Sequence, residues 1–236
     1  MEGSALKVLH IISTPREHQS NTLIVANAFF EALQAAQPSV QIDIVDLYAQ
    51  DLPAIAGENI EVKYTLMIGH PIDKSHEESW REIELLIQHF LSADLYVIST
   101  PMWNFGIPYA LKYYIDCIIQ PGYVFTYNGQ GQVVPLCLGK RMVCITSRGG
   151  DYSPTGPLHA FDFQEPYLRA IFGFIGITDM QFINAQPMDS KPALRTAALE
   201  AAIEQARALA SQTGWAASSV SLPAFTEPEP LDMGSS

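Results

Sequence analysis

Short β-rich segments alternate with longer helical segments along this chain, and this alternation limits its fold to very few classes. Residues 6–13 and 95–100 are apolar runs of strand length, whereas residues 21–36 and 75–92 carry apolar side chains at helical spacing. Units of strand, helix and strand form parallel sheets that helices cover on both faces. We expect strands over residues 6–13, 40–45, 95–100, 141–147 and 178–185, and helices over residues 21–36, 75–92, 109–119, parts of 157–174, and 192–212.

These elements predict an α/β protein with the flavodoxin-like fold, a three-layer sandwich around a five-stranded parallel sheet in the order 2-1-3-4-5. Ligands of such sheets bind outside the carboxyl ends of the strands. Residues 122–135 predict a hairpin insertion, and residues 46–75 predict a long irregular connection. We assign residues 1–215 to a single domain and expect residues 216–236, which hold no basic residue, to form a disordered tail.

The composition disfavours several kinds of partner. A formal net charge of −12 opposes binding to nucleic-acid phosphate and to anionic membranes. No apolar run approaches the roughly 20 residues of a membrane-spanning helix, and the N-terminus lacks the pattern of a secretion signal. Cys117, Cys137 and Cys144 lie in apolar runs and are expected to be reduced core thiols, which favours the cytoplasm.

An unusual apolar segment follows the third expected strand. Residues 101–106 read Pro-Met-Trp-Asn-Phe-Gly, at a point where a buried strand normally ends in a polar turn. Exposing Met102, Trp103 and Phe105 there is costly unless something flat and partly apolar rests on them. Loops held by a rigid scaffold are frequent binding sites. The segment therefore indicates a planar ligand without identifying it.

The segment after the first strand is rich in hydroxyl and amide side chains and leads directly into a helix. The backbone N–H groups at the start of that helix, together with Ser20 and Asn21, are suited to hold a phosphate group. Simple helix capping by the same residues fits the sequence about equally well. Neither GxxxxGK[ST] nor GxGxxG occurs in this segment, which argues against an ATPase and against a dinucleotide-binding fold.

A third segment, Ser147-Arg148-Gly149-Gly150, follows the fourth expected strand. Its two glycines allow a ligand to approach the backbone closely, and Arg148 either balances a negative charge or faces solvent. In the order 2-1-3-4-5, strands one, three and four are neighbours, so all three segments are expected to line one crevice. This convergence indicates a site more strongly than any one segment does.

Metal and nucleophile chemistry find little support in the sequence. The six histidines are scattered, and no carboxylate or thiolate stands at metal-ligand spacing from them. The GxSxG motif of a serine nucleophile does not occur. We therefore predict that the chain holds no metal site and uses no catalytic nucleophile.

At these residues the chain resembles the FMN-dependent NADH-azoreductase and NAD(P)H:quinone oxidoreductase family of flavodoxin-like proteins. The similarity runs over most of residues 5–212. It is densest at residues 101–108, 111–116, 125–127 and 145–150, and residues 174–177 extend it. The resemblance implies a homodimer with one FMN per subunit, bound near the dimer interface.

The resemblance also implies which residues bind the cofactor. The FMN phosphate is expected at the loop after the first strand and the isoalloxazine at the loop after the third, and the loop after the fourth completes the site. Tyr127 and Phe174 match positions that look toward the partner subunit's flavin and substrate pocket. The predicted cofactor-binding residues are Ser13, Gln19, Ser20, Asn21, Pro101, Met102, Trp103, Asn104, Phe105, Ser147, Arg148, Gly149 and Gly150. Whether Ser13 or Thr14 is the upstream hydroxyl stays open.

The family resemblance implies a two-step reaction. NADH or NADPH gives a hydride to flavin N5, and a quinone or an azo compound then accepts two electrons at the same stacked position. Because the flavin carries the chemistry, no acid–base side chain is expected to be essential. Two alternatives are a flavodoxin-like electron carrier, which suits the acidic surface, and a redox-regulatory protein that holds FMN and contacts a partner. Residues 46–75 and 122–135 supply walls for a second pocket, which favours the enzyme.

Overall fold

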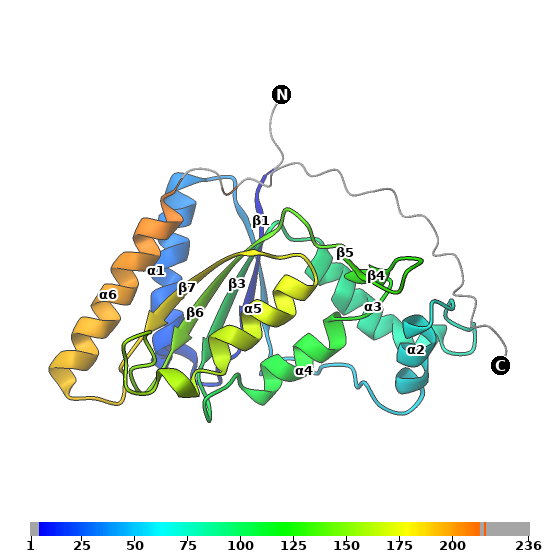
Figure 1. The fold of residues 1–236 in the computed structure, drawn as a ribbon. Coiled ribbons are helices and arrows are strands. Elements are labelled where there is room, and N and C mark those ends of the chain that lie inside the picture. Colours follow the sequence, from blue (N-terminus) through cyan, green and yellow to red (C-terminus); the bar gives the residue numbers. More distant parts are fainter. Residues whose placement is uncertain (1–4, 213–214, 216–236) are drawn as a thin grey trace.

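A parallel sheet forms the middle layer of the structure (Figure 1). The computed structural model describes residues 5–212 and 215. The strands follow the order β2-β1-β3-β6-β7, which is 2-1-3-4-5 when only the strands of this sheet are counted, so the predicted order is confirmed. The five strands are β1 (Lys7–Ile12), β2 (Gln41–Asp46), β3 (Leu95–Pro101), β6 (Arg141–Ser147) and β7 (Asp179–Ala185).

Helices cover both faces of the sheet, as Figure 1 shows. On one face, Phe29 of α1 and Ala206 of α6 join sheet residues such as Val97 in one buried apolar cluster. On the other face, α3, α4 and α5 contribute to a second cluster with residues such as Ile98. The helices are α1 (Asn21–Ala36), α2 (Glu58–Met67), α3 (Glu77–Leu91), α4 (Tyr109–Ile118), α5 (Gln164–Phe174) and α6 (Pro192–Ala210), with short 3-10 turns η1 (Glu17–Gln19) and η2 (His159–Phe161).

Strand β3 lies at the centre of the sheet and is buried from Leu95 to Thr100. A strand that helices cover on both faces is apolar throughout rather than alternating, which is why residues 95–100 read as one apolar run. Pro101, the last residue of β3, pairs with Ser147, the last residue of β6. The loops that follow these two strands therefore start side by side.

The predicted hairpin insertion is confirmed. Strands β4 (Phe125–Tyr127) and β5 (Val133–Pro135) pair in antiparallel fashion and form a separate two-stranded sheet. The ring of Phe125 contacts Phe174 at the end of α5, with 4.8 Å between the ring centroids. The insertion is thus anchored to the sandwich by aromatic packing.

The expectation of an irregular segment at residues 46–75 is wrong for its middle part, which forms α2. Val62 is the one buried side chain of this helix among the described residues, so the sequence carries no apolar stripe at helical spacing. Glu58 and Glu61 occupy the first turn, where negative charge is favourable. Local electrostatics and packing against α3 therefore hold a helix that hydrophobic periodicity does not reveal.

The three cysteines are free and buried, as predicted. Burial raises the pKa of the Cys117 and Cys137 thiols to about 12, so both are protonated and unreactive at neutral pH. Within residues 5–212 and 215, no helix has both the length and the apolar character needed to cross a membrane. The predicted tail, residues 216–236, lies outside the described residues.

His10 makes the stability of the fold depend on pH. Its ring is buried in β1, with Nε2 2.8 Å from Ser99 Oγ, and burial lowers its pKa from 6.5 to about 4. Below pH 6.5 the unfolded chain therefore binds a proton that the folded chain does not, and stability falls as the pH drops toward 4.

We expect His10 to account for a loss of about 2 kcal/mol in the free energy of unfolding between pH 7 and pH 5. Urea denaturation at the two pH values measures it, with His10→Gln as the control because glutamine keeps a donor for Ser99. The pH-dependent loss should be smaller in the variant by this amount. Equal losses in the wild type and the variant would refute the assignment.

Candidate functional site

The three loops that the sequence singles out meet at one edge of the sheet. The Ser13 N–H donates to Ser99 O (2.9 Å), which ties the loop after β1 to β3. The Met102 N–H donates to Ser147 O (2.9 Å), which ties the loop after β3 to the end of β6. The three loops therefore begin side by side, as predicted, but the cavity at this edge is lined by residues of the second and third loops and by none of the first.

The start of α1 is suited to an anion. Within the described residues no side chain caps this helix, and its first turn holds no acidic residue, whereas α2, α3 and α5 each carry glutamate there. The Oγ of Ser20 lies 2.7 Å from Thr22 Oγ1 instead of accepting a backbone N–H. The N–H groups of the first turn are therefore available to a negatively charged group.

The other polar residues of this loop differ in burial. Ser13 is fully buried, and its Oγ has no hydrogen-bond partner in the part of the chain that the structure describes. Thr14 is also buried, and its Oγ1 accepts the Arg16 N–H at 3.4 Å. Gln19 is exposed on η1, and Asn21 is half-buried at the start of α1. The orphaned hydroxyl makes Ser13 the better candidate for the upstream contact, because an unpaired buried polar group is costly.

A tight turn displays the residues after β3. Trp103 and Gly106 exchange two backbone hydrogen bonds of 3.0 Å, and Asn104 and Phe105 between them have φ values of 48° and 70°. Two positive φ values in succession are typical of type I′ turns, which favour Asn and Gly. Phenylalanine in this conformation is strained by about 1–2 kcal/mol. The turn therefore holds the Phe105 ring in place at the expense of stability.

The two aromatic rings of this turn, Trp103 and Phe105, each lie close to other aromatic rings. The ring of Trp103 lies 6.3 Å from Tyr48 and 6.4 Å from Tyr109, measured between centroids. The ring of Phe105 lies 5.3 Å from Phe161 in η2. Burial raises the pKa of Tyr48 to about 12, so this phenol is neutral at physiological pH. Sequence reasoning missed Tyr48, Tyr109 and Phe161 as neighbours of the turn. Tyr48 and Phe161 come from distant parts of the chain, whereas Tyr109 follows the turn closely, at the start of α4.

A cavity of about 420 Å³ opens between the loops after β3 and β6. Its lining includes Tyr152 and Asp189, which were not predicted. Asp189 follows β7, the strand next to β6, so the strand order could have pointed to it, whereas nothing in the sequence singles out Tyr152. The full lining is Met102, Asn104, Phe105, Gly149, Gly150, Tyr152 and Asp189.

Both glycines of the third segment leave room for neighbouring side chains. A β-carbon added to Gly149 would collide with the Asp189 carboxylate, and one added to Gly150 would collide with Leu158 Cδ1. Larger residues at these positions would push side chains aside at the rim of the cavity. The backbone of both glycines thus forms part of the cavity wall.

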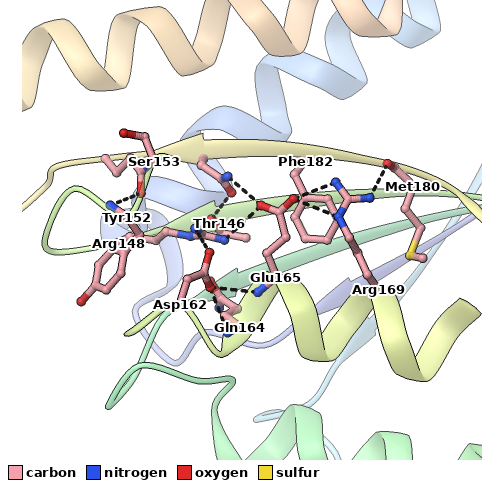
Figure 2. A network of polar contacts seen from close by, with 12 residues as sticks. Thr146, Arg148, Tyr152, Ser153, Asp162, Gln164, Glu165, Arg169, Met180 and Phe182 are labelled. Carbon is pink, nitrogen blue, oxygen red and sulfur yellow. Dashed lines mark hydrogen bonds and ion pairs between the residues drawn. The ribbon is translucent and has the colours of Figure 1, made fainter. Parts of the chain in front are cut away.

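Arg148 balances a negative charge, one of the two arrangements considered from the sequence, and that charge belongs to the protein itself. Its side chain is 1% exposed, and its guanidinium donates to Asp162 Oδ2 at 2.8 Å and to Thr146 Oγ1 at 2.9 Å (Figure 2). The side chain therefore does not face solvent, and the charge that it balances is Asp162. The guanidinium is buried and is not part of the cavity lining, so only the backbone of Arg148 is left to contact a cofactor.

Tyr127 and Phe174, the predicted substrate-pocket residues, lie away from the cavity. Tyr127 belongs to β4 and Phe174 ends α5, and both rings pack against Phe125. Neither is part of the cavity lining. Their expected role toward a partner subunit stays a prediction. Among residues 5–212 and 215, no group of three or more His, Cys, Asp or Glu side chains could hold a metal ion.

Comparison with known proteins identifies relatives along nearly the whole length of the chain. A family model described as the flavodoxin-like fold matches residues 6–210. An FMN-dependent NADH:quinone oxidoreductase from Nitratidesulfovibrio vulgaris is 37% identical over 204 residues, which cover 86% of this chain and 97% of the relative. A protein of the same name from Nostoc punctiforme is 41% identical over 196 residues, which cover 83% and 94%.

A solved structure shares the architecture. The FMN-dependent NADH-azoreductase from Bacillus anthracis str. Ames Ancestor, in complex with FMN, superposes with a TM-score of 0.77 at 28% identity. The superposition covers 87% of this chain and 98% of that one.

Proposed function

The chain belongs to this family with the flavodoxin-like fold, and on that premise we propose that it is an FMN-dependent oxidoreductase. It uses NADH or NADPH to reduce quinones or azo compounds by two-electron hydride transfer. The observation that carries the proposal is the cavity of about 420 Å³ between the loops after β3 and β6, at the sheet edge where the loop after β1 also begins. The 37% and 41% identity to proteins named FMN-dependent NADH:quinone oxidoreductases supports it.

The residues present fit both ends of FMN, its phosphate group and its flat ring. The uncapped start of α1 and the orphaned hydroxyl of Ser13 suit the phosphate group. At the other end, Met102, Asn104 and Phe105 offer apolar and amide contacts to a flat ring, and the backbone of Gly149 allows close approach. Pockets with an apolar lining and a few well-placed polar groups are typical of cofactor sites.

Bound FMN supplies the redox chemistry, accepting a hydride from the nicotinamide and passing two electrons to the acceptor. The protein side chains bind the cofactor, orient the substrates against it and keep water out of the site. Phe105 and Trp103 provide flat apolar surfaces, and the half-buried Met102 adds an adaptable one. No titratable side chain of the cavity is assigned an essential acid–base role.

The arrangement of exposed aromatic residues supports a homodimer with the site at the interface. Tyr109 is 70% exposed and Phe163 is 60% exposed, next to the turn that carries Trp103 and Phe105. A second copy that covers these rings would remove an apolar patch from water and close the cavity. Sedimentation equilibrium is expected to give twice the chain mass, and a monomer at micromolar concentration would contradict the dimer. The buried reduced thiols support a cytoplasmic location.

Steady-state kinetics test the enzymatic function. Because donor and acceptor use one stacked position in turn, double-reciprocal plots with NADH varied at several quinone concentrations are expected to be parallel. Intersecting lines would contradict the alternating mechanism. An electron carrier or a regulatory FMN protein, which the acidic surface would also suit, would retain FMN but show negligible turnover with quinones and azo dyes.

Asn104 offers a test of the ring contacts. Asn104→Ala and Asn104→Gly both remove the amide, and each is expected to weaken FMN binding roughly tenfold, the worth of one or two hydrogen bonds. With φ at 48°, alanine also strains the turn by about 1 kcal/mol, whereas glycine does not. Titration of the apoprotein with FMN and urea denaturation separate the two effects. Unchanged affinity in both variants would refute a role for the amide.

A further inference from the structure

A buried ionic network adjoins the loop after β6, whose glycines line the cavity. The Arg148 guanidinium donates through Nη1 to Asp162 Oδ2 at 2.8 Å and through Nε to Thr146 Oγ1 at 2.9 Å, and Nη2 lies 3.7 Å from Glu165 Oε2. Figure 2 shows Arg148 reaching from β6 to the start of α5, where Asp162 and Glu165 lie. The network therefore joins the end of β6, which leads into Gly149, to the start of α5.

The residues that Arg148 holds contact the other cofactor loop. Asp162 Oδ1 accepts the N–H groups of Gln164 (3.0 Å) and Glu165 (3.1 Å), which fixes the start of α5. Gln164 Nε2 then donates to Pro101 O at 2.9 Å, and the Phe163 N–H donates to Phe105 O at 3.0 Å. Residues 162–164 thus attach to the loop after β3 at both ends of its exposed segment.

The loop after β6 is fixed independently by backbone hydrogen bonds to β7. The Arg148 N–H donates to Ala185 O, and the Met188 and Asp189 N–H groups donate to Arg148 O and Gly149 O. The guanidinium is therefore not needed to hold its own loop. What it adds, beside the Met102 N–H to Ser147 O hydrogen bond, is a second connection from the loop after β6 through Asp162 to the loop after β3.

Stability alone is a weak reason for this ion pair. The side chains of Arg148 and Asp162 are 1% and 8% exposed, and the desolvation of two such charges offsets most of their attraction. An apolar pair of similar size often stabilises a fold as well or better. A forked guanidinium between a hydroxyl and a carboxylate does, however, fix distance and direction more closely than apolar packing does.

We propose that Arg148 and Asp162 are positioning residues, a buried brace that sets the separation of the loops at residues 101–105 and 149–150. This inference rests on the proposed function, in which both loops contact FMN. The brace acts on the cofactor through Gln164 and Phe163, which hold the loop after β3, and it touches neither cofactor nor substrate.

Four variants separate this role from ordinary stabilisation. Asp162→Asn keeps the Oδ1 that accepts the helix N–H groups but removes the charge that pairs with Arg148. Arg148→Met/Asp162→Asn leaves no unpaired charge and is expected to recover the urea midpoint that Asp162→Asn loses. Arg148→Lys keeps the charge without the fork. Arg169→Gln is the matched control, because Arg169 binds the same Glu165 at 2.7 Å from the exposed side and reaches neither loop.

Two readouts are measured on each variant. The first is the FMN dissociation constant, which is expected to rise roughly tenfold in Asp162→Asn and in the double variant, less in Arg148→Lys, and not in Arg169→Gln. The second is hydrogen–deuterium exchange of the apoprotein. Peptides covering residues 101–106 and 159–165 are expected to exchange faster in Asp162→Asn and in the double variant, and in neither of the other two.

The double variant decides the question because its fold is expected to be stable. If Arg148→Met/Asp162→Asn binds FMN and exchanges hydrogen as the wild type does, Arg148 and Asp162 do not position the two loops. If Arg169→Gln changed the FMN dissociation constant and the hydrogen–deuterium exchange as much as Asp162→Asn does, the positioning role would also be refuted. A wild-type protein that binds no FMN would refute the proposed function instead, and the exchange of the apoprotein would still decide whether residues 148 and 162 fix the two loops.

Discussion

Replacement of Ser20 by aspartate is expected to abolish FMN binding at working concentrations without weakening the fold. Ser20 precedes α1 in an extended conformation (φ −79°, ψ 121°), a position where aspartate is a good cap. Its carboxylate would occupy the N–H groups that suit the phosphate. At a separation of about 5 Å and an effective dielectric constant of about 20, each unit of phosphate charge is repelled by about 3 kcal/mol, roughly a 100-fold loss of affinity.

Two comparisons make this result specific to the phosphate. Ser20→Asn has nearly the same size without the charge and is expected to retain most of the affinity for FMN. Riboflavin, which lacks the phosphate, is expected to bind Ser20→Asp and the wild type equally. Fluorescence titration of the apoproteins measures all four combinations. Equal losses for riboflavin and FMN would mean that the variant damages the site as a whole, and an unchanged FMN affinity would place the phosphate elsewhere.

The second large effect is expected from Gly149→Ala/Gly150→Ala. Each new methyl group would project from the cavity wall and collide with a side chain, Asp189 of the cavity lining in one case and Leu158 in the other. Because the clashing atoms, Asp189 Oδ2 and Leu158 Cδ1, are the ends of flexible side chains that can turn aside, the free energy of unfolding is expected to fall by only about 1 kcal/mol, the low end for overpacking. Displacement of the wall is expected to weaken FMN binding roughly 100-fold, equivalent to about 3 kcal/mol.

The hairpin loop supplies the control for this pair. A β-carbon added to Gly129 meets no atom of the described residues within 4 Å, so Gly129→Ala is expected to leave both affinity and stability unchanged. Urea denaturation and FMN titration of both variants measure the difference. A double variant that binds FMN within about twofold of the wild type would show that the two glycines do not form the contact surface.

The regular elements could be predicted because hydrophobic periodicity determines them. The α1 helix begins and ends where its apolar spacing predicts, and β3 reads as a strand because helices bury both of its faces. The α2 helix was missed because it has a single buried residue, Val62, among those described, and depends on its acidic first turn and on α3. Periodicity reports burial, and a helix that buries little gives little signal.

The site was predictable as three loops but not as a set of side-chain contacts. Strand order places Ser13, Met102 and Gly149 at one edge, and that order follows from the alternation of elements. The partner of Arg148 is Asp162, on a segment whose path depends on tertiary packing, so the sequence left its guanidinium unassigned. For the same reason Tyr152 could not be predicted as part of the cavity wall.

Anaerobic reduction by NADH tests the central claim most directly. The purified protein, reconstituted with FMN if necessary, is expected to be yellow and to lose its visible flavin absorption when NADH is added without oxygen. Addition of a quinone is then expected to restore the absorption. Protein that stays colourless after incubation with FMN, or bound flavin that NADH and NADPH fail to reduce, would contradict the assignment as an FMN-dependent oxidoreductase.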